Sequence, residues 1–152
     1  LSEGLSGSII TIQLWLLVLL QWPVGTWMSR KSLRLGLILS LISLGFGCLI
    51  VTYSSLIYHG AVLLVLSQLL FAIGLAAFLP TATQAVIEGT PSSKRGIAMA
   101  LFSQCFAITA LASPVVAGRL LDSNGHLFLL WLSMFALCII VLPCVRFIQQ
   151  AN

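Results

Sequence analysis

Apolar residues occupy this chain in long runs that charged residues interrupt only at short turns. No Asp, Glu, Lys or Arg occurs between Gly4 and Ser29 or between Leu35 and Ile87. The runs lack the alternation of polar and apolar positions that a membrane barrel needs, and in hydrocarbon a helix satisfies its own backbone hydrogen bonds. Because a spanning helix needs about 20 mostly apolar residues, the pattern predicts five spans, over residues 5–28, 33–52, 61–87, 96–121 and 127–145.

Turn residues divide the longest charge-free run, which exceeds the length of one span. Polar residues at 52–55 and the Tyr58-His59-Gly60 segment predict a turn between the second and third helices. The third helix contains Pro80. Proline removes one helical hydrogen bond, so we expect a kink there.

Composition excludes a soluble domain. Of the 152 residues, 60% are hydrophobic and 7% are charged, and the mean hydropathy is +1.15, whereas soluble proteins carry roughly 25% charged residues. The expected fold class is an all-α, polytopic transmembrane helix bundle, one transmembrane region over residues 1–152. The cysteines lie in apolar runs without a C-x-x-C pair and are expected to be small buried apolar residues: Cys48, Cys105, Cys138 and Cys144. We expect no disulfide, metal site or cofactor.

The positive charge of the chain is concentrated in turns. The net charge of +4 comes from cations beside apolar spans rather than from a basic stripe with exposed aromatics, so topology explains it better than a nucleic-acid partner. With five spans, one face of the membrane receives Arg30, Lys31, Arg34, Lys94, Arg95 and Arg146, and the other receives Arg119. Because cytoplasmic loops are enriched in Lys and Arg, we expect an outside N-terminus and a cytoplasmic C-terminus in the plasma (inner) membrane.

Small residues form a stripe along the fourth predicted helix. At 100° per residue its members fall within about 40° of one line: Gly96, Ala100, Ser103, Ala107, Ala110, Pro114 and Gly118. Such a stripe permits close helix packing in lipid, and we expect it to serve packing or gating. A second line of residues shares one face of the third helix, and this face either borders a polar cavity or forms a packing surface. Its members are Ser67, Phe71, Gly74, Phe78, Thr81, Ala85 and Glu88.

Three glutamines lie inside the apolar runs. A primary amide in hydrocarbon needs partners for its donors and its acceptor, so Gln13, Gln68 and Gln104 are candidates for contact with a polar substrate. A backbone carbonyl or another helix could satisfy each of them equally well. No set of carboxylates or of Ser and His residues can meet at mid-depth, so we do not expect an enzyme. Glu88 is expected to pair with Lys94 or Arg95 across its own turn.

Three motifs, in order, carry a family resemblance. The first is Gly25-x-x-x-Ser29-Arg30-x-x-x-Arg34, which resembles the G-x-x-x-D-R-x-G-R-R loop of the major facilitator superfamily. The second runs from Pro80 through Glu88-x-x-Pro91-x-x-x-Arg95-Gly96 and is similar to the loop after the tenth helix of that family. The third, Ser113-Pro114-x-x-Ala117-Gly118, is similar to its Gly-Pro-x-x-Gly-Gly bend.

The resemblance places the chain within the family fold. Ser29 replaces the acidic residue of the loop motif, and such a degraded copy is typical of the second half of these transporters. The chain then corresponds to helices eight to twelve, with helix seven and the N-terminal half missing, and its start at Leu1 also suggests a fragment. In family terms, Arg30 and Arg34 help to latch the cytoplasmic helix ends.

The resemblance implies alternating access around a midplane site. The expected function is a secondary active transporter of small molecules, exporting drugs or metabolites with proton coupling. Its partners are the substrate, the bilayer and the missing N-terminal half. The expected substrate wall comprises Gln13, Gln68, Phe71 and Gln104. The alternative is a five-span membrane scaffold that associates through the small-residue stripe of the fourth helix.

Overall fold

The structure of the chain, a computed structural model, describes residues 3–28, 30–54, 61–124 and 127–149. Within these ranges it contains five α-helices and no strand. The helices are α1 (Glu3–Met28), α2 (Leu33–Ser54), α3 (Ala61–Glu88), α4 (Arg95–Asn124) and α5 (Leu127–Val141), with short 3-10 helices η1 (Ser92–Lys94) and η2 (Leu142–Gln149). The all-α class predicted from the hydrophobic pattern is confirmed.

Four helices of the described part are long and apolar enough to cross a membrane, namely Leu33–Ser54, Val62–Glu88, Ser92–Arg119 and Phe128–Val145. They correspond to the second to fifth predicted spans. Helix α1 is not among them, although it has 26 residues. Two glutamines, three tryptophans and Pro23 interrupt the aliphatic residues of α1.

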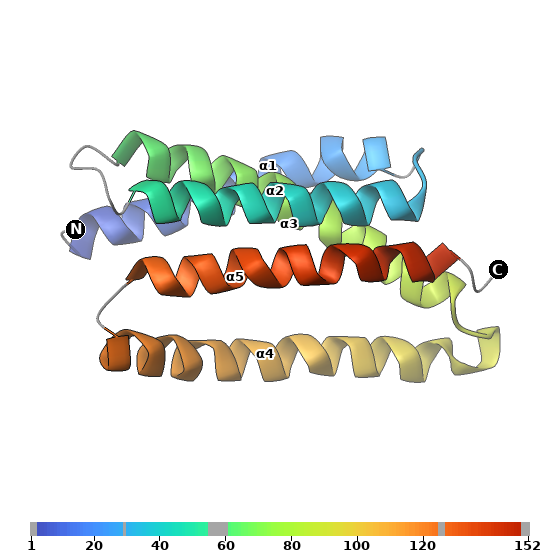
Figure 1. Cartoon of the computed structure of the whole chain (residues 1–152). Helices are drawn as coiled ribbons and strands as arrows, with labels where there is room; N and C mark the ends of the chain where they lie inside the picture. The colour runs from blue at the N-terminus through green and yellow to red at the C-terminus, as the bar shows by residue number, and fades with distance from the viewer. Residues whose placement is uncertain (1–2, 29, 55–60, 125–126, 150–152) are drawn as a thin grey trace.

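Helices α1, α3, α2 and α5 pack side by side in that order, and α4 lies along the outside of the bundle (Figure 1). The most extensive helix contacts are those of α2 with α3, followed by α1 with α3 and α2 with α5. The α1–α2 and α3–α4 turns lie at the end of the bundle that also holds the C-terminus (Figure 1).

The α2–α3 interface is built on small residues of α2. These residues are buried and fall within about 45° of one line: Gly36, Ser40, Ser43, Gly47 and Ser54, with Val51 among them. Glycines allow the two helices to approach closely, since a Cβ added at Gly74 would lie 2.7 Å from Leu44 Cγ. A Cβ added at Gly47 would lie 2.8 Å from the Phe71 ring.

The second line of residues on α3 belongs to this interface. Ser67 is fully buried, Thr81 is 4% exposed, and Gly74 faces Leu44 of α2. The hydroxyl of Ser43 donates a hydrogen bond of 2.7 Å to the carbonyl of Leu70, which joins α2 directly to α3. Of the two interpretations of this face, a polar cavity or a packing surface, the structure shows the packing surface.

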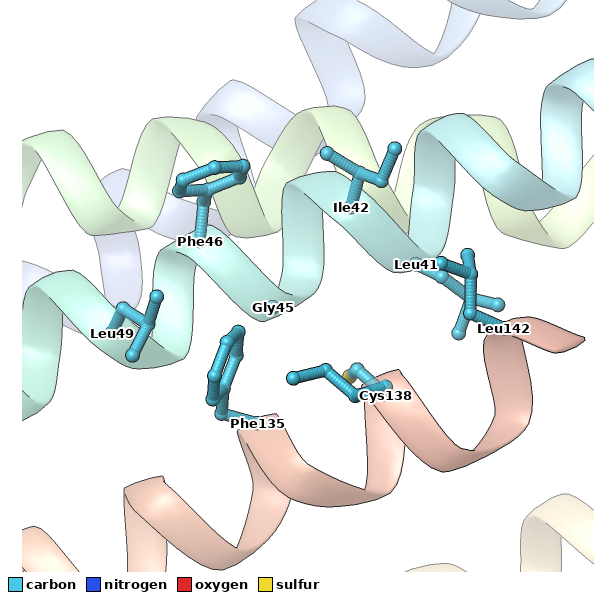
Figure 2. Close-up of a pocket in the computed structure, with 9 residues that line it drawn as sticks. Leu41, Ile42, Gly45, Phe46, Leu49, Phe135, Cys138 and Leu142 are labelled. Carbon is cyan, nitrogen blue, oxygen red and sulfur yellow. The ribbon is translucent and has the colours of Figure 1, made fainter.

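An open apolar cavity of about 190 Å³ lies at the α2–α5 contact. Figure 2 shows Phe135 and Cys138 of α5 pointing toward Gly45 of α2, which has no side chain to fill the space. Every residue around this cavity is apolar: Leu41, Ile42, Gly45, Phe46, Leu49, Phe135, Cys138, Ile139 and Leu142. It offers no hydrogen-bonding group to a polar ligand.

Candidate functional site

The residues predicted to line a substrate wall lie on three different helices. Gln13 is half-buried on α1, and Gln104 is exposed on α4. Gln68 is buried on α3, where its amide donates a 3.3 Å hydrogen bond to the Ser67 hydroxyl. Phe71 faces Gly47, and its ring centroid lies 5.9 Å from that of Trp131. Gln68 and Phe71 thus lie within packed helices, and substrate contact by these four residues stays a prediction.

An open groove with three polar side chains in a mainly apolar lining lies between α1 and α3. Its volume is about 560 Å³, and its polar side chains are Gln21, Thr83 and Gln84. Gly25, Leu79, Pro80 and Ile87 complete the lining. A smaller cavity of about 40 Å³ adjoins it and shares Gly25, Pro80 and Gln84.

Local backbone features open this groove. A Cβ added at Gly25 would have no neighbour within 4 Å, so the absence of a side chain there leaves open space beside α3. On α3, Pro80 lacks an N–H and leaves one carbonyl of the preceding turn without its helical donor. The hydroxyl of Thr83 donates to Leu79 O at 2.8 Å and is therefore satisfied within its own helix. The groups left to bind a polar ligand are the amide of Gln21 and the part of the Gln84 amide that does not donate to Glu88.

Glu88 lies at the edge of this groove, one helical turn beyond Gln84. Its Oε1 accepts a 2.7 Å hydrogen bond from Gln84 Nε2. The predicted pairing with Lys94 or Arg95 is wrong, because Arg95 Nε donates to the carbonyls of Ile87 at 3.1 Å and Thr90 at 3.3 Å. The carbonyls at the end of α3 lack helical donors. Arg95 satisfies one of them, Ile87 O, and the Glu88 carboxylate remains beside the groove.

Gln21 and Gln84 are not among the residues that the sequence predicts for a substrate wall. The available signal was spacing: Gln21 precedes Gly25 by four residues, and Pro80 precedes Gln84 by four. Residues four apart share a helix face. Each amide therefore lies beside a residue that leaves the helix surface open.

The basic turn after α1 is ordered by its own hydrogen bonds. Arg30 and Lys31 are exposed, and Arg34 is half-buried in the first turn of α2. Ser29 of the loop motif lies outside the described residues. The hydroxyl of Ser32 accepts a 3.4 Å hydrogen bond from the N–H of Leu35, so Ser32 is the residue that caps α2.

The small-residue stripe of α4 is exposed in the described bundle. Gly118 is half-buried, and the other six members are exposed: Gly96, Ala100, Ser103, Ala107, Ala110 and Pro114. A Cβ added at Gly96 or Gly118 would meet nothing within 4 Å. The aromatic contacts between α3 and α4 lie on another face, where Phe78 meets Phe106. A packing or gating role for the stripe stays a prediction.

The cysteines are free thiols with different environments. Cys48 is buried and Cys138 is half-buried, whereas Cys105 and Cys144 are exposed. The prediction of uniformly buried cysteines is therefore wrong for the last two: Cys105 lies on the outer helix α4, and Cys144 lies on an exposed side of η2. In the part of the chain that the structure describes, no three His, Cys, Asp or Glu residues lie close enough to hold a metal ion.

Comparison with known proteins gives the family. The model of the Major Facilitator Superfamily matches residues 1–150. The chain belongs to this superfamily. No curated protein and no solved structure matches it. Membership makes the chain part of a membrane transporter, and the spanning helices of the fold agree with an integral membrane protein that handles small molecules.

Proposed function

We propose that this Major Facilitator Superfamily chain forms part of a proton-coupled exporter of drugs or metabolites. The observation that carries the proposal is the environment of α4. This helix is long enough to span a membrane, yet none of the residues in its most apolar stretch is buried. A helix of this kind suits the wall of a path that further helices of the same transporter complete.

The exposed surface of α4 has two chemically different faces. Large apolar residues such as Ile97, Leu101 and Ile108 are more than 60% exposed and suit lipid. The small-residue stripe lies on a separate face, and Gln104 lies between the two. We propose that the stripe faces the N-terminal half of the transporter and that Gln104 borders the substrate path.

The α1–α3 groove supplies the second part of the proposal. Gln21 and Gln84 offer neutral amides that suit an uncharged polar substrate, and Glu88 offers a carboxylate bonded to one of these amides. Protonation of Glu88 would change the hydrogen bond that it accepts from Gln84. We propose Glu88 as the group that couples proton movement to substrate binding.

Reconstitution tests the transport proposal. The full-length protein in sealed vesicles should move at least one member of a panel of drugs and metabolites when a proton gradient is imposed. Dissipating the gradient with an ionophore should abolish uphill movement. An inert full-length protein across the panel would contradict the proposal.

Glu88→Gln tests the coupling role separately from substrate binding. The variant keeps a hydrogen-bonding side chain but cannot exchange a proton, so uphill transport should be lost while downhill exchange of substrate continues. Asp122→Asn is the matched control, because Asp122 is an exposed carboxylate at the far end of α4. Unchanged uphill transport in Glu88→Gln would exclude Glu88 as the coupling group.

The exposure of the α4 stripe also favours the alternative, a membrane scaffold that associates through this face. For that function, Ala107→Leu should reduce oligomer size in detergent, because the larger side chain prevents close approach. Ile108→Leu, a change on the lipid-facing side, should leave it unchanged. An oligomer that Ala107→Leu leaves intact would remove the support for a scaffold.

A further inference from the structure

The turn between α1 and α2 places cations next to an exposed indole ring. Arg30 N donates to Trp27 O at 3.3 Å and Lys31 N donates to Met28 O at 2.9 Å, so the chain folds back over the end of α1. As a result, Lys31 Nζ lies 5.9 Å from the centroid of the Trp27 ring. Trp27 is 53% exposed. Trp22, five residues earlier, is 79% exposed and lies about 140° away around the helix.

The charges of this turn have no acidic partner within the described part of the chain. Arg30 and Lys31 are exposed, and Arg34 lies in the first turn of α2, which contains no acidic residue. A helix N-terminus carries a partial positive charge and favours anions, so a cation there adds to an unfavourable potential. The carboxylate of Glu88, at the same end of the bundle, is bonded to Gln84 and forms no ion pair.

The α3–α4 turn repeats this arrangement. Lys94 and Arg95 lie at the start of α4, whose first turn also lacks an acidic residue. Both turns lie at one end of the bundle (Figure 1). Two helices thus begin at the same membrane face with cations where an anion is favoured, and among the described residues the one carboxylate at this end, that of Glu88, is hydrogen-bonded to Gln84 and not ion-paired with them.

We propose that the α1–α2 turn is a docking site for the phosphate of an anionic phospholipid. Arg30, Lys31 and Arg34 meet the phosphate, and the ring of Trp27 lies against the glycerol region beside it. Tryptophan is enriched at this depth because its ring is apolar and its N–H is polar. An exposed indole beside the cations distinguishes a lipid from a free anion, since a free anion has no apolar part to cover the ring.

Lipid retention by the purified full-length protein tests this site. In native mass spectrometry from detergent, phosphatidylglycerol should bind more tightly than phosphatidylcholine with the same acyl chains. Replacing Arg30 and Lys31 by Gln should weaken phosphatidylglycerol binding by about fivefold for each cation removed. Arg119→Gln removes an exposed cation near the other end of α4 and should leave the binding unchanged.

Two further measurements test the alternative explanations, which are loss of folding and binding of a free anion. Arg30→Lys keeps the charge and should retain phosphatidylglycerol, which separates loss of charge from loss of folding. Inorganic phosphate at the same concentration should not displace the lipid. Equal retention of the two lipids, equal weakening by Arg119→Gln, or displacement by inorganic phosphate would each overturn the proposal.

Discussion

At the scale of single residues, the glycines differ by what surrounds them rather than by their helical location. Gly36, Gly47 and Gly74 lie at the α2–α3 interface, where an added Cβ would come within 3 Å of a side chain of the facing helix. Gly118 is equally helical, but an added Cβ there would meet nothing within 4 Å. Helix propensity favours alanine over glycine in both places. Packing reverses that preference only at the interface.

Gly74→Ala should destabilise the bundle by about 1–3 kcal/mol, because the new methyl group would lie 2.7 Å from Leu44 Cγ and 3.3 Å from its backbone N. The measurement is the midpoint of unfolding in mixed detergent. Gly118→Ala is the matched control and should leave stability unchanged or raise it by up to about 1 kcal/mol. Equal effects of the two substitutions would show that α2 and α3 are not closely packed here.

Ser43→Ala tests the hydrogen bond between helices. The substitution removes the 2.7 Å bond to Leu70 O, and such bonds in membrane proteins contribute on average about 0.6 kcal/mol. Ser40→Ala on the same buried face removes only a 2.8 Å bond to Leu37 O within its own helix. We expect a measurable loss of unfolding free energy for Ser43→Ala and a smaller one for Ser40→Ala. The reverse order would contradict the role of Ser43.

At the scale of the elements, α4 differs from the other helices in how it is held. Its aromatic contacts lie near the α3–α4 turn, where Phe106 stacks edge-on with Phe78 of α3 and with Phe102 of its own helix. Beyond Phe106, every residue from Ala107 to Val116 is exposed. The contact of α4 with α3 is therefore concentrated in the half of the helix that precedes Ala107.

Phe106→Ala should loosen α4 from the bundle. The two aromatic pairs that it removes contribute about 0.5–1.5 kcal/mol each beyond burial, and proteolysis at the α3–α4 turn should become faster. Phe46→Ala removes a ring that is 57% exposed on α2 and serves as the control. Equal rates of cleavage in the two variants would exclude the Phe78–Phe106 contact as the attachment of α4.

At the scale of the whole molecule, the charge distribution predicts the orientation in the membrane. Two spanning helices, α2 and α3, separate the turns at Lys31 and Lys94, so both turns lie on one face. Arg119 lies toward the other end of α4. The excess of cations at the first face predicts that this face is cytoplasmic.

Labelling with a membrane-impermeant thiol reagent checks the orientation. In a background without the four native cysteines, Lys94→Cys should react only after the cells are opened. Arg119→Cys should react in intact cells. Reaction of Lys94→Cys in intact cells would show the opposite orientation.

Long apolar runs determined the helical class and the approximate helix ends, because the cost of unpaired backbone groups in lipid leaves few alternatives to a helix. The motifs around Arg30, Arg95 and Pro114 likewise indicated the family that the comparison then confirmed. These features depend on local sequence. They can therefore be predicted without knowing which helices are neighbours.

Only the tertiary structure decided how the helix faces are used. Two stripes of small residues look equivalent in the sequence, yet the stripe with Gly36 and Gly47 on α2 is buried while the stripe with Ala107 on α4 is exposed. The groove formed by Gln21 and Gln84 could not be predicted from the sequence either, because it depends on α1 lying beside α3. Periodicity shows which residues share a face, but the partner of that face is set by contacts between distant segments.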